Sequence, residues 1–119
     1  MDANTVAIVK AYYSHIDAGK IDEVIKIFTQ NILYQRGNRL IEGIDELRIF
    51  YKKERTLQGI HTLRKITLDK DKIKVEGIFE GTAKNKKVKF EFSDTFIFGK
   101  NNKVKERRTQ SRDIDVANI

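Results

Sequence analysis

Residues 88–98 alternate between apolar and polar side chains, and this pattern constrains the fold strongly. They read VKFEFSDTFIF, and one alternating set consists of Val88, Phe90, Phe92, Asp94, Phe96 and Phe98. Successive side chains of a β-strand point to opposite faces of its sheet. The segment is therefore predicted to be a strand that carries a single carboxylate, Asp94, on an aromatic face.

Asp94 is the first candidate for a functional residue. A carboxylate among phenyl rings is costly to keep charged, so we expect its pKa to rise and the group to act as an acid or a hydrogen-bond donor. The alternative is that Arg107 or Arg108 neutralises it. If the hairpin loop has five residues, 99–103, Arg108 lies opposite Asp94, whereas a bulge of one residue turns Arg107 inward.

The rest of the chain predicts three helices followed by a four-stranded antiparallel meander. Helices are expected up to Ala18, over Asp22–Phe28 and over Ile44–Arg55, with a short strand at Ile32–Arg36. After Gly59 the period changes to two, and strands are expected over Ile60–Leu68, Ile73–Ala83, the Asp94 segment and Val104–Arg112. This order indicates the α+β class.

Composition excludes several kinds of protein. The 119 residues suit one domain, 1–119, and the absence of Cys together with only two His argues against a metal site or a cofactor. No signal-type or membrane-length apolar run occurs, which predicts a soluble cytoplasmic protein. Motifs for nucleotide binding (GxGxxG, GxxxxGK) and for serine hydrolysis (GxSxG) are also missing.

The net charge of +7 is concentrated in residues 84–112, which hold ten Lys or Arg and three acidic residues. A basic region can bind nucleic acid. Most of these lysines fall at turns and on alternate strand positions, a pattern typical of lysines that protect sheet edges. Nucleic-acid binding is therefore not expected.

Five further residues complete the candidate site. Tyr12 and Tyr13 are adjacent on the first helix, so that one can anchor the core while the other sends its hydroxyl into a cavity. Tyr34 and Arg36 share a strand face, and Arg36 could bind an anionic group or lie on the surface. His61, at the start of a strand, could be a general base or a histidine bonded to a backbone carbonyl.

Four segments carry a family resemblance: YYSHIDAGKIDEVIKIF (12–28), LYQRGN (33–38), FYKKER with GIH (50–55 and 59–61) and FSDTFIFGKNNKVKERRT (92–109). In this order they resemble the SnoaL-like and ketosteroid-isomerase-like branch of the nuclear transport factor 2-like (NTF2-like) superfamily. The resemblance implies a cone, in which three N-terminal helices wrap a strongly bent antiparallel sheet around a pocket. It also implies a homodimer through the outer sheet face, where Ile78 and Ile97 are apolar.

The resemblance to ketosteroid isomerase can be followed residue by residue. Tyr12 and Asp94 match the tyrosine and the protonated aspartate of its oxyanion hole. Arg36 stands at the position of the general base, and an arginine cannot abstract a proton. Steroid isomerase activity is therefore not expected, and His61 or His15 would have to be the base. Limonene-epoxide-hydrolase-like chemistry is disfavoured too, because the strand over Ile73–Ala83 lacks the Arg and Asp two residues apart.

Two functions follow from this reading. The first is an isomerase or cyclase for a small apolar carbonyl compound, in which Asp94 is the acid, Tyr12 or Tyr13 assists, His61 is the base and Arg36 orients the substrate. The second is a ligand-binding or dimerisation domain without catalysis, which a cone filled by its own phenylalanines would favour. In both, the ligand is a small hydrophobic or anionic molecule, and the expected pocket residues are Tyr13, Tyr34, Arg36, Phe92, Phe96 and Arg108.

Overall fold

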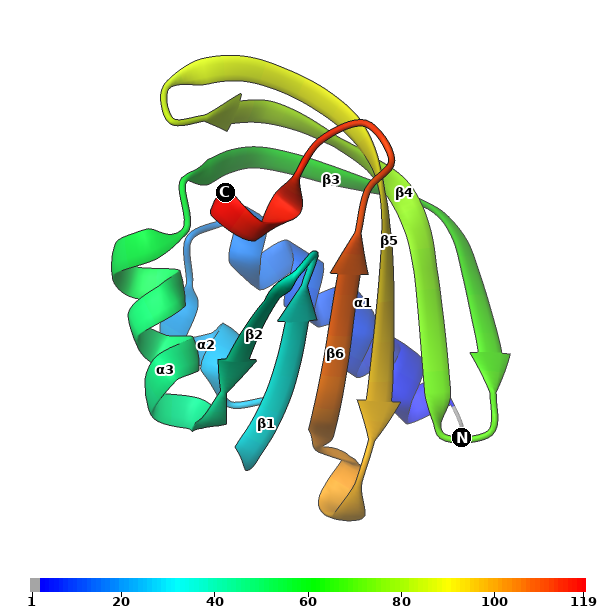
Figure 1. The fold of residues 1–119 in the computed structure, drawn as a ribbon. Helices are drawn as coiled ribbons and strands as arrows, with labels where there is room; N and C mark the ends of the chain where they lie inside the picture. Colours follow the sequence, from blue (N-terminus) through cyan, green and yellow to red (C-terminus); the bar gives the residue numbers. More distant parts are fainter. Residues whose placement is uncertain (1–2) are drawn as a thin grey trace.

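The computed structural model describes residues 3–119 as helices packed against one six-stranded sheet (Figure 1). The helices are α1 (Ala3–Asp17), α2 (Ile21–Ile25) and α3 (Gly43–Ile49), and a π-helical turn, η1 (Phe50–Glu54), continues α3. The strands are β1 (Phe28–Arg36), β2 (Arg39–Glu42), β3 (Leu57–Asp69), β4 (Lys72–Ala83), β5 (Lys86–Phe98) and β6 (Val104–Gln110). Two short 3-10 turns are η2 (Lys100–Asn102) and η3 (Val116–Asn118). The predicted α+β class is confirmed.

Helix α1 ends where the sequence predicts. Its buried side chains recur three or four residues apart: Val9, Tyr12, Tyr13 and Ile16. Gly19 adopts a left-handed φ of 74°. The amides of Gly19 and Lys20 then donate to the carbonyls of Ile16 and His15, which satisfies the last turn of the helix.

The second and third helices are shorter than the sequence suggests. Helix α2 stops at Ile25 because Phe28 is already the first residue of β1 and is buried. Helix α3 widens into η1, where the amide of Arg55 donates to the carbonyl of Phe50 at 2.7 Å. Such wide turns are rare and often occur at functional sites. Here the turn buries both Phe50 and Tyr51.

The sheet is mixed rather than purely antiparallel, which corrects the prediction. Its strand order is β2-β1-β6-β5-β4-β3. The predicted meander of β3 to β6 is antiparallel, but β1 runs parallel to β6. Strand β2, which was not predicted, pairs with β1 through the turn at Gly37. Side-chain alternation predicts which face a residue occupies, but it says nothing of the direction of the neighbouring strand.

A bulge in the β5–β6 hairpin decides which arginine faces the core. Phe98 pairs with Val104, but Ile97 pairs with Glu106, so Lys105 is an extra residue. Beyond this point Asp94 lies opposite Thr109, and Arg107 turns inward. The straight register, with Arg108 opposite Asp94, is therefore wrong.

The sheet is strongly bent along the paired strands β3, β4 and β5 (Figure 1). Glycines allow the backbones of β3 and β4 to approach closely at the bend. Gly59 and Gly81 pair with each other, and a Cβ on Gly81 would lie 2.0 Å from the carbonyl oxygen of Gln58. A Cβ on Gly77 would lie 2.2 Å from the carbonyl oxygen of Thr62. The curvature therefore depends on positions that only glycine fits.

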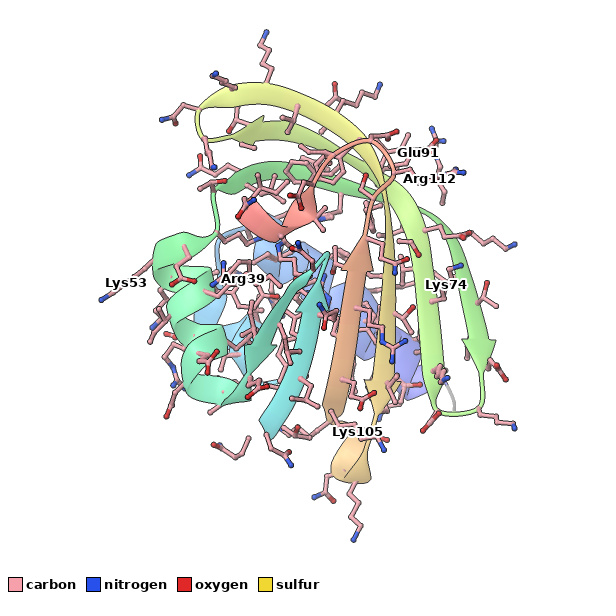
Figure 2. All side chains as sticks on the ribbon, in the orientation of Figure 1. Arg39, Lys53, Lys74, Glu91, Lys105 and Arg112 are labelled. Atoms are coloured by element: carbon pink, nitrogen blue, oxygen red, sulfur yellow. The ribbon has the colours of Figure 1, made fainter. Side chains whose placement is uncertain are left out.

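After β6 the chain folds back over the open end of the cone, and we call residues 111–119 the tail (Figure 1). The carbonyl oxygen of Ile119 accepts a bond of 3.0 Å from the amide of Thr56, before β3. Charged side chains such as Lys53, Lys74 and Lys105 extend from the surface (Figure 2). No helix among residues 3–119 is long and apolar enough to cross a membrane.

Replacement of Gly81 by alanine is expected to lower the free energy of unfolding by about 1–3 kcal/mol, because the new methyl group must displace backbone. Urea denaturation checks this. Glu80→Ala, on the exposed side of the same strand, is the control and should change stability by no more than about 0.5 kcal/mol. Equal effects of the two substitutions would contradict the role assigned to Gly81.

Candidate functional site

Two rows of side chains cross the inner face of the sheet and create the polar centre of the cone. One row runs from β5 across β6 to β1 and consists of Asp94, Thr109 and Arg36, which are paired in the sheet. The next row crosses the same three strands and consists of Phe96, Arg107 and Tyr34. Facing residues in neighbouring strands lie close enough for direct contact. The sheet register thus assembles polar groups that are distant in sequence.

Asp94 is only 1% exposed and accepts hydrogen bonds from three side chains. Arg107 Nη2 donates to Oδ2 at 3.0 Å, and Tyr13 Oη donates to the same oxygen at 2.5 Å. Thr109 Oγ1 donates to Oδ1. The carboxylate is therefore held as an acceptor by one cation and two hydroxyl groups.

The expectation that Asp94 is neutral is wrong. Burial alone would raise the pKa of Asp94, but the positive charge of Arg107 and the hydrogen bonds from Thr109 and Tyr13 hold it below its usual value of 3.8. The pKa of Arg107 responds in the opposite sense: burial alone would lower it, but the carboxylate of Asp94 raises it well above its usual value. Asp94 and Arg107 are both charged at neutral pH.

Two buried tyrosines complete the surroundings of Arg107. Its Nη1 donates to the hydroxyl oxygens of Tyr12 and Tyr51, the latter at 2.8 Å, and these two hydroxyls lie 2.8 Å apart. The guanidinium carbon also lies 4.3 Å from the ring centre of Tyr12 and 4.9 Å from that of Phe96. Burial raises the pKa of Tyr12 and of Tyr51, so that both remain protonated hydrogen-bonding groups.

A chain of hydrogen bonds joins Arg36 to Asp94. Arg36 Nη1 donates to Tyr34 Oη at 2.7 Å, and Tyr34 Oη lies 2.8 Å from Thr109 Oγ1. Because the single hydroxyl proton of Thr109 is given to Asp94, Tyr34 must be the donor to Thr109. Aligned hydrogen bonds of this kind polarise one another and make the arrangement rigid. We call these residues the inner network: Tyr12, Tyr13, Tyr34, Arg36, Tyr51, Asp94, Arg107 and Thr109.

His61 lies beside the inner network and pairs with an aspartate. Its Nδ1 is 2.6 Å from Asp17 Oδ1, and its backbone amide donates to Asp17 Oδ2 at 2.9 Å. The imidazole packs against the rings of Tyr13, Phe79 and Phe92 at 4.9–5.2 Å between centres. An aspartate that fixes one imidazole nitrogen is a common way to orient a histidine base.

A cavity of about 20 Å³ lies at the open end of the inner network. Its lining combines three arginines with aromatic and aliphatic side chains: Tyr12, Arg36, Arg55, Leu57, His61, Phe90, Phe92, Asp94, Arg107, Thr109 and Val116. A single water needs about 10–15 Å³ of this kind of volume. The cavity therefore holds one small group and not a whole drug-sized molecule.

An open depression of about 820 Å³ adjoins this cavity. It lies where the tail crosses the bent sheet, and Phe92 and Val116 line both hollows. Its outer lining is charged and includes Arg64 and Arg112. Arg112 Nη2 lies 3.9 Å from Glu91 Oε2, and both side chains are labelled in Figure 2. Phe92 and Val116 thus separate the cavity from an exposed hollow.

The structure brings most of the predicted site residues together. Those on the inner side of the sheet are Tyr12, Tyr13, Tyr34, Arg36, His61, Phe92, Asp94 and Phe96. The prediction that Arg108 faces the pocket is wrong. Arg108 lies opposite Thr95 on the outer side of the sheet, is exposed, and does not line the cavity.

The sequence interpretation missed Thr109, Tyr51 and Asp17, and it left Arg107 as an alternative to Arg108. Arg107 and Thr109 depend on the hairpin bulge, and Tyr51 depends on the π-helical turn. Nothing in the sequence pattern indicates that Asp17 reaches His61. Across residues 3–119, no group of three or more His, Asp or Glu side chains could hold a metal ion.

The chain has the cone fold shared by NTF2-like, SnoaL-like and ketosteroid-isomerase-like proteins, which confirms the resemblance at the level of the fold. It is similar to SalBIII, an epoxide hydrolase/cyclase-like enzyme with a role in pyran ring formation in the polyether salinomycin. That pair shares 19% identity with a TM-score of 0.81, over 94% of this chain and 93% of the other. A putative SnoaL-like polyketide cyclase from Jannaschia sp. CCS1 is 14% identical, with a TM-score of 0.77 over 95% and 91%.

The same fold is found in a de novo designed protein with a curved β-sheet. It is 21% identical to this chain, with a TM-score of 0.72 over 93% of this chain and 88% of the other. No protein-family model matches the sequence, and no curated protein matches it. These comparisons establish the fold alone, so function must be argued from the site.

Replacement of Arg107 by methionine should lower the free energy of unfolding by about 3–5 kcal/mol, because the carboxylate of Asp94 would remain buried without a cation. Arg108→Met, one residue away on the exposed side, is the matched control and should change it by no more than about 0.5 kcal/mol. Urea denaturation of both variants measures the difference. A larger loss for Arg108→Met would contradict the observed register.

The side-chain carboxyl carbon of Asp94 should titrate below pH 3.8 in a carbon-13 NMR experiment, with Asp94→Asn as the assignment control. A group whose pKa is lower in the folded protein contributes stability above its ordinary pKa. This contribution is lost as pH falls through the folded value, so stability should decline with acidification below about pH 3.8. A midpoint above 3.8 would show that the ion pair with Arg107 is not formed.

Proposed function

We propose that this chain is a binding protein that holds a small ligand at the polar end of the cone without acid catalysis by Asp94. The observation that carries this proposal is an excess of positive charge around the cavity. Arg36, Arg55 and Arg107 line it, and Asp94 is the one carboxylate among the lining residues, while Asp17 nearby is paired with His61. Buried charge is stable only when it is paired and hydrogen-bonded.

The electrostatics of Arg55 support this excess. Burial and the positive charge of Arg36 lower the pKa of Arg55, although nearby tyrosines act in the opposite direction. Arg55 satisfies one donor with the carbonyl oxygen of Leu57 at 3.0 Å. The three arginines that line the cavity outnumber its one lining carboxylate, Asp94, by two charges. This excess favours an anionic ligand.

The state of Asp94 argues against its use as an acid. An acid in an oxyanion hole must carry a proton at neutral pH, and the three donors on Asp94 stabilise its ionised form. Tyr12 is likewise committed to Arg107 and Tyr51. The match to the oxyanion hole of ketosteroid isomerase is thus one of position, while the chemistry of the group differs.

An isomerase or cyclase acting on a small carbonyl compound is the second candidate, and the pair of His61 and Asp17 favours it. A histidine fixed by a carboxylate can abstract a proton, and His61 lines the cavity. Structural neighbours described as cyclase-like are consistent with this candidate. In this form the enzyme would use His61 as its base and Arg36 to orient the substrate.

The homodimer through the outer sheet face stays a prediction. Ile60, 60% exposed on β3, and the partly buried Ile78 on β4 are apolar side chains available on that face, whereas Ile97 is already buried within the chain. A dimer would cover this surface and leave the cavity accessible from the tail side.

Binding and catalysis can be separated with acetate, acetamide and cyclohexanone as probes. We expect at least one of them to give saturable nitrogen-15 NMR shifts in the inner network, with no deuterium exchange into cyclohexanone above the uncatalysed rate. Exchange that is accelerated by the wild type and lost in His61→Gln, but retained in His15→Gln, would instead establish the enzyme. His15 is a suitable control because it lines neither hollow. The absence of any saturable shift would overturn the binding proposal.

A further inference from the structure

Arg36 is only 3% exposed, yet two of its three side-chain nitrogens have no hydrogen-bond partner among residues 3–119. Nη1 donates to Tyr34, but among residues 3–119 no group accepts a hydrogen bond from Nε or Nη2. Nearly all buried polar groups in proteins have partners, so an unused pair requires an explanation. Arg36 also lines the small cavity.

Nε and Nη2 are the two donors on one edge of a guanidinium group. Their N–H bonds are parallel, and their spacing matches the two oxygens of a carboxylate. Arg36 is held in place on the opposite edge by Tyr34 and on its face by Phe50, whose ring centre lies 5.1 Å from the guanidinium carbon. The free edge is therefore fixed in orientation before any ligand arrives.

We propose that the free edge of Arg36 is a subsite for a carboxylate group, which it binds through two parallel hydrogen bonds inside the cavity. This inference rests on the binding function proposed above and names the chemistry of the ligand. Asp94 does not fill this role: its carboxylate accepts hydrogen bonds from Arg107, Tyr13 and Thr109, and neither Nε nor Nη2 of Arg36 donates to it. Arg55 adds a second positive charge beside the subsite.

The size of the two hollows defines which carboxylates fit. The cavity of about 20 Å³ holds only a small group. The adjoining depression of about 820 Å³ is large enough for the remainder of a longer molecule, and Phe92 and Val116 form the boundary between them. A carboxylate can therefore come from a small free acid, or from the end of a longer acid when the Val116 side chain moves.

The test is a titration of the wild-type protein with sodium acetate and with acetamide, which has the same shape but no charge, at constant ionic strength. The nitrogen-15 signal of Arg36 Nε is observed directly. We expect acetate to shift this signal saturably and to bind at least about tenfold more tightly than acetamide, because its oxygens accept charge-assisted hydrogen bonds. Equal binding of acetamide would overturn the carboxylate subsite and leave the binding function intact.

Two variants of Arg36 and a matched control extend the test. Arg36→Lys keeps the charge but removes the parallel donors, and Arg36→Met removes both, so each should weaken acetate binding by about tenfold or more, followed through the signals of Tyr34 and Thr109. Arg108→Met, on the exposed side of β6, should bind acetate like the wild type. An equal loss in Arg108→Met would show that acetate responds only to overall charge, and would overturn the subsite.

The length of the acid distinguishes the two sources. Saturation by acetate but not by hexanoate assigns the subsite to a small free acid. Tighter binding of hexanoate, with shifts that extend to Val116 and Ile119, assigns it to the end of a longer molecule admitted beside the tail. If acetate, hexanoate, acetamide and cyclohexanone all fail to produce a saturable shift, the binding function itself falls, and the subsite with it.

Discussion

The buried ion pair between Arg107 and Asp94 is the interaction on which the rest of the inner face depends. Both side chains are almost fully buried, and each is costly to bury alone. Their geometry is therefore supported by further hydrogen bonds from Tyr13 and Thr109 to the carboxylate and from the guanidinium to Tyr12 and Tyr51. The hydrogen bonds of this ion pair therefore connect helix α1, the π-helical turn η1 and strands β5 and β6.

This arrangement changes what the cone can do. An aspartate in a dry aromatic pocket would be an acid, but an aspartate paired with an inward arginine is ionised at neutral pH. The pair neutralises itself and leaves Arg36 and Arg55 as the uncompensated groups beside the cavity. The function that we propose therefore depends on recognition of negative charge at Arg36 and not on proton transfer at Asp94, whereas the second candidate function depends on His61, which pairs with Asp17.

Much of the architecture could be predicted from local patterns. Alternation predicted strands over residues 73–83 and 88–98, and the inner face of the second was predicted correctly because side-chain direction has a strict period of two. The boundaries of α2 and α3, the strand β2 and the parallel pairing of β1 with β6 were missed. These features depend on contacts between distant segments, which a local pattern does not contain.

The sequence by itself determined that Asp94 lies on an aromatic inner face, and that Tyr34 and Arg36 share a strand face, because alternation along a strand is a local property. Only the tertiary structure decided that Arg107 and not Arg108 meets Asp94. The hairpin absorbs one extra residue, Lys105, and a shift of one residue turns every following side chain of β6 to the opposite face. That single bulge determines whether the central carboxylate is a neutral acid or half of an ion pair.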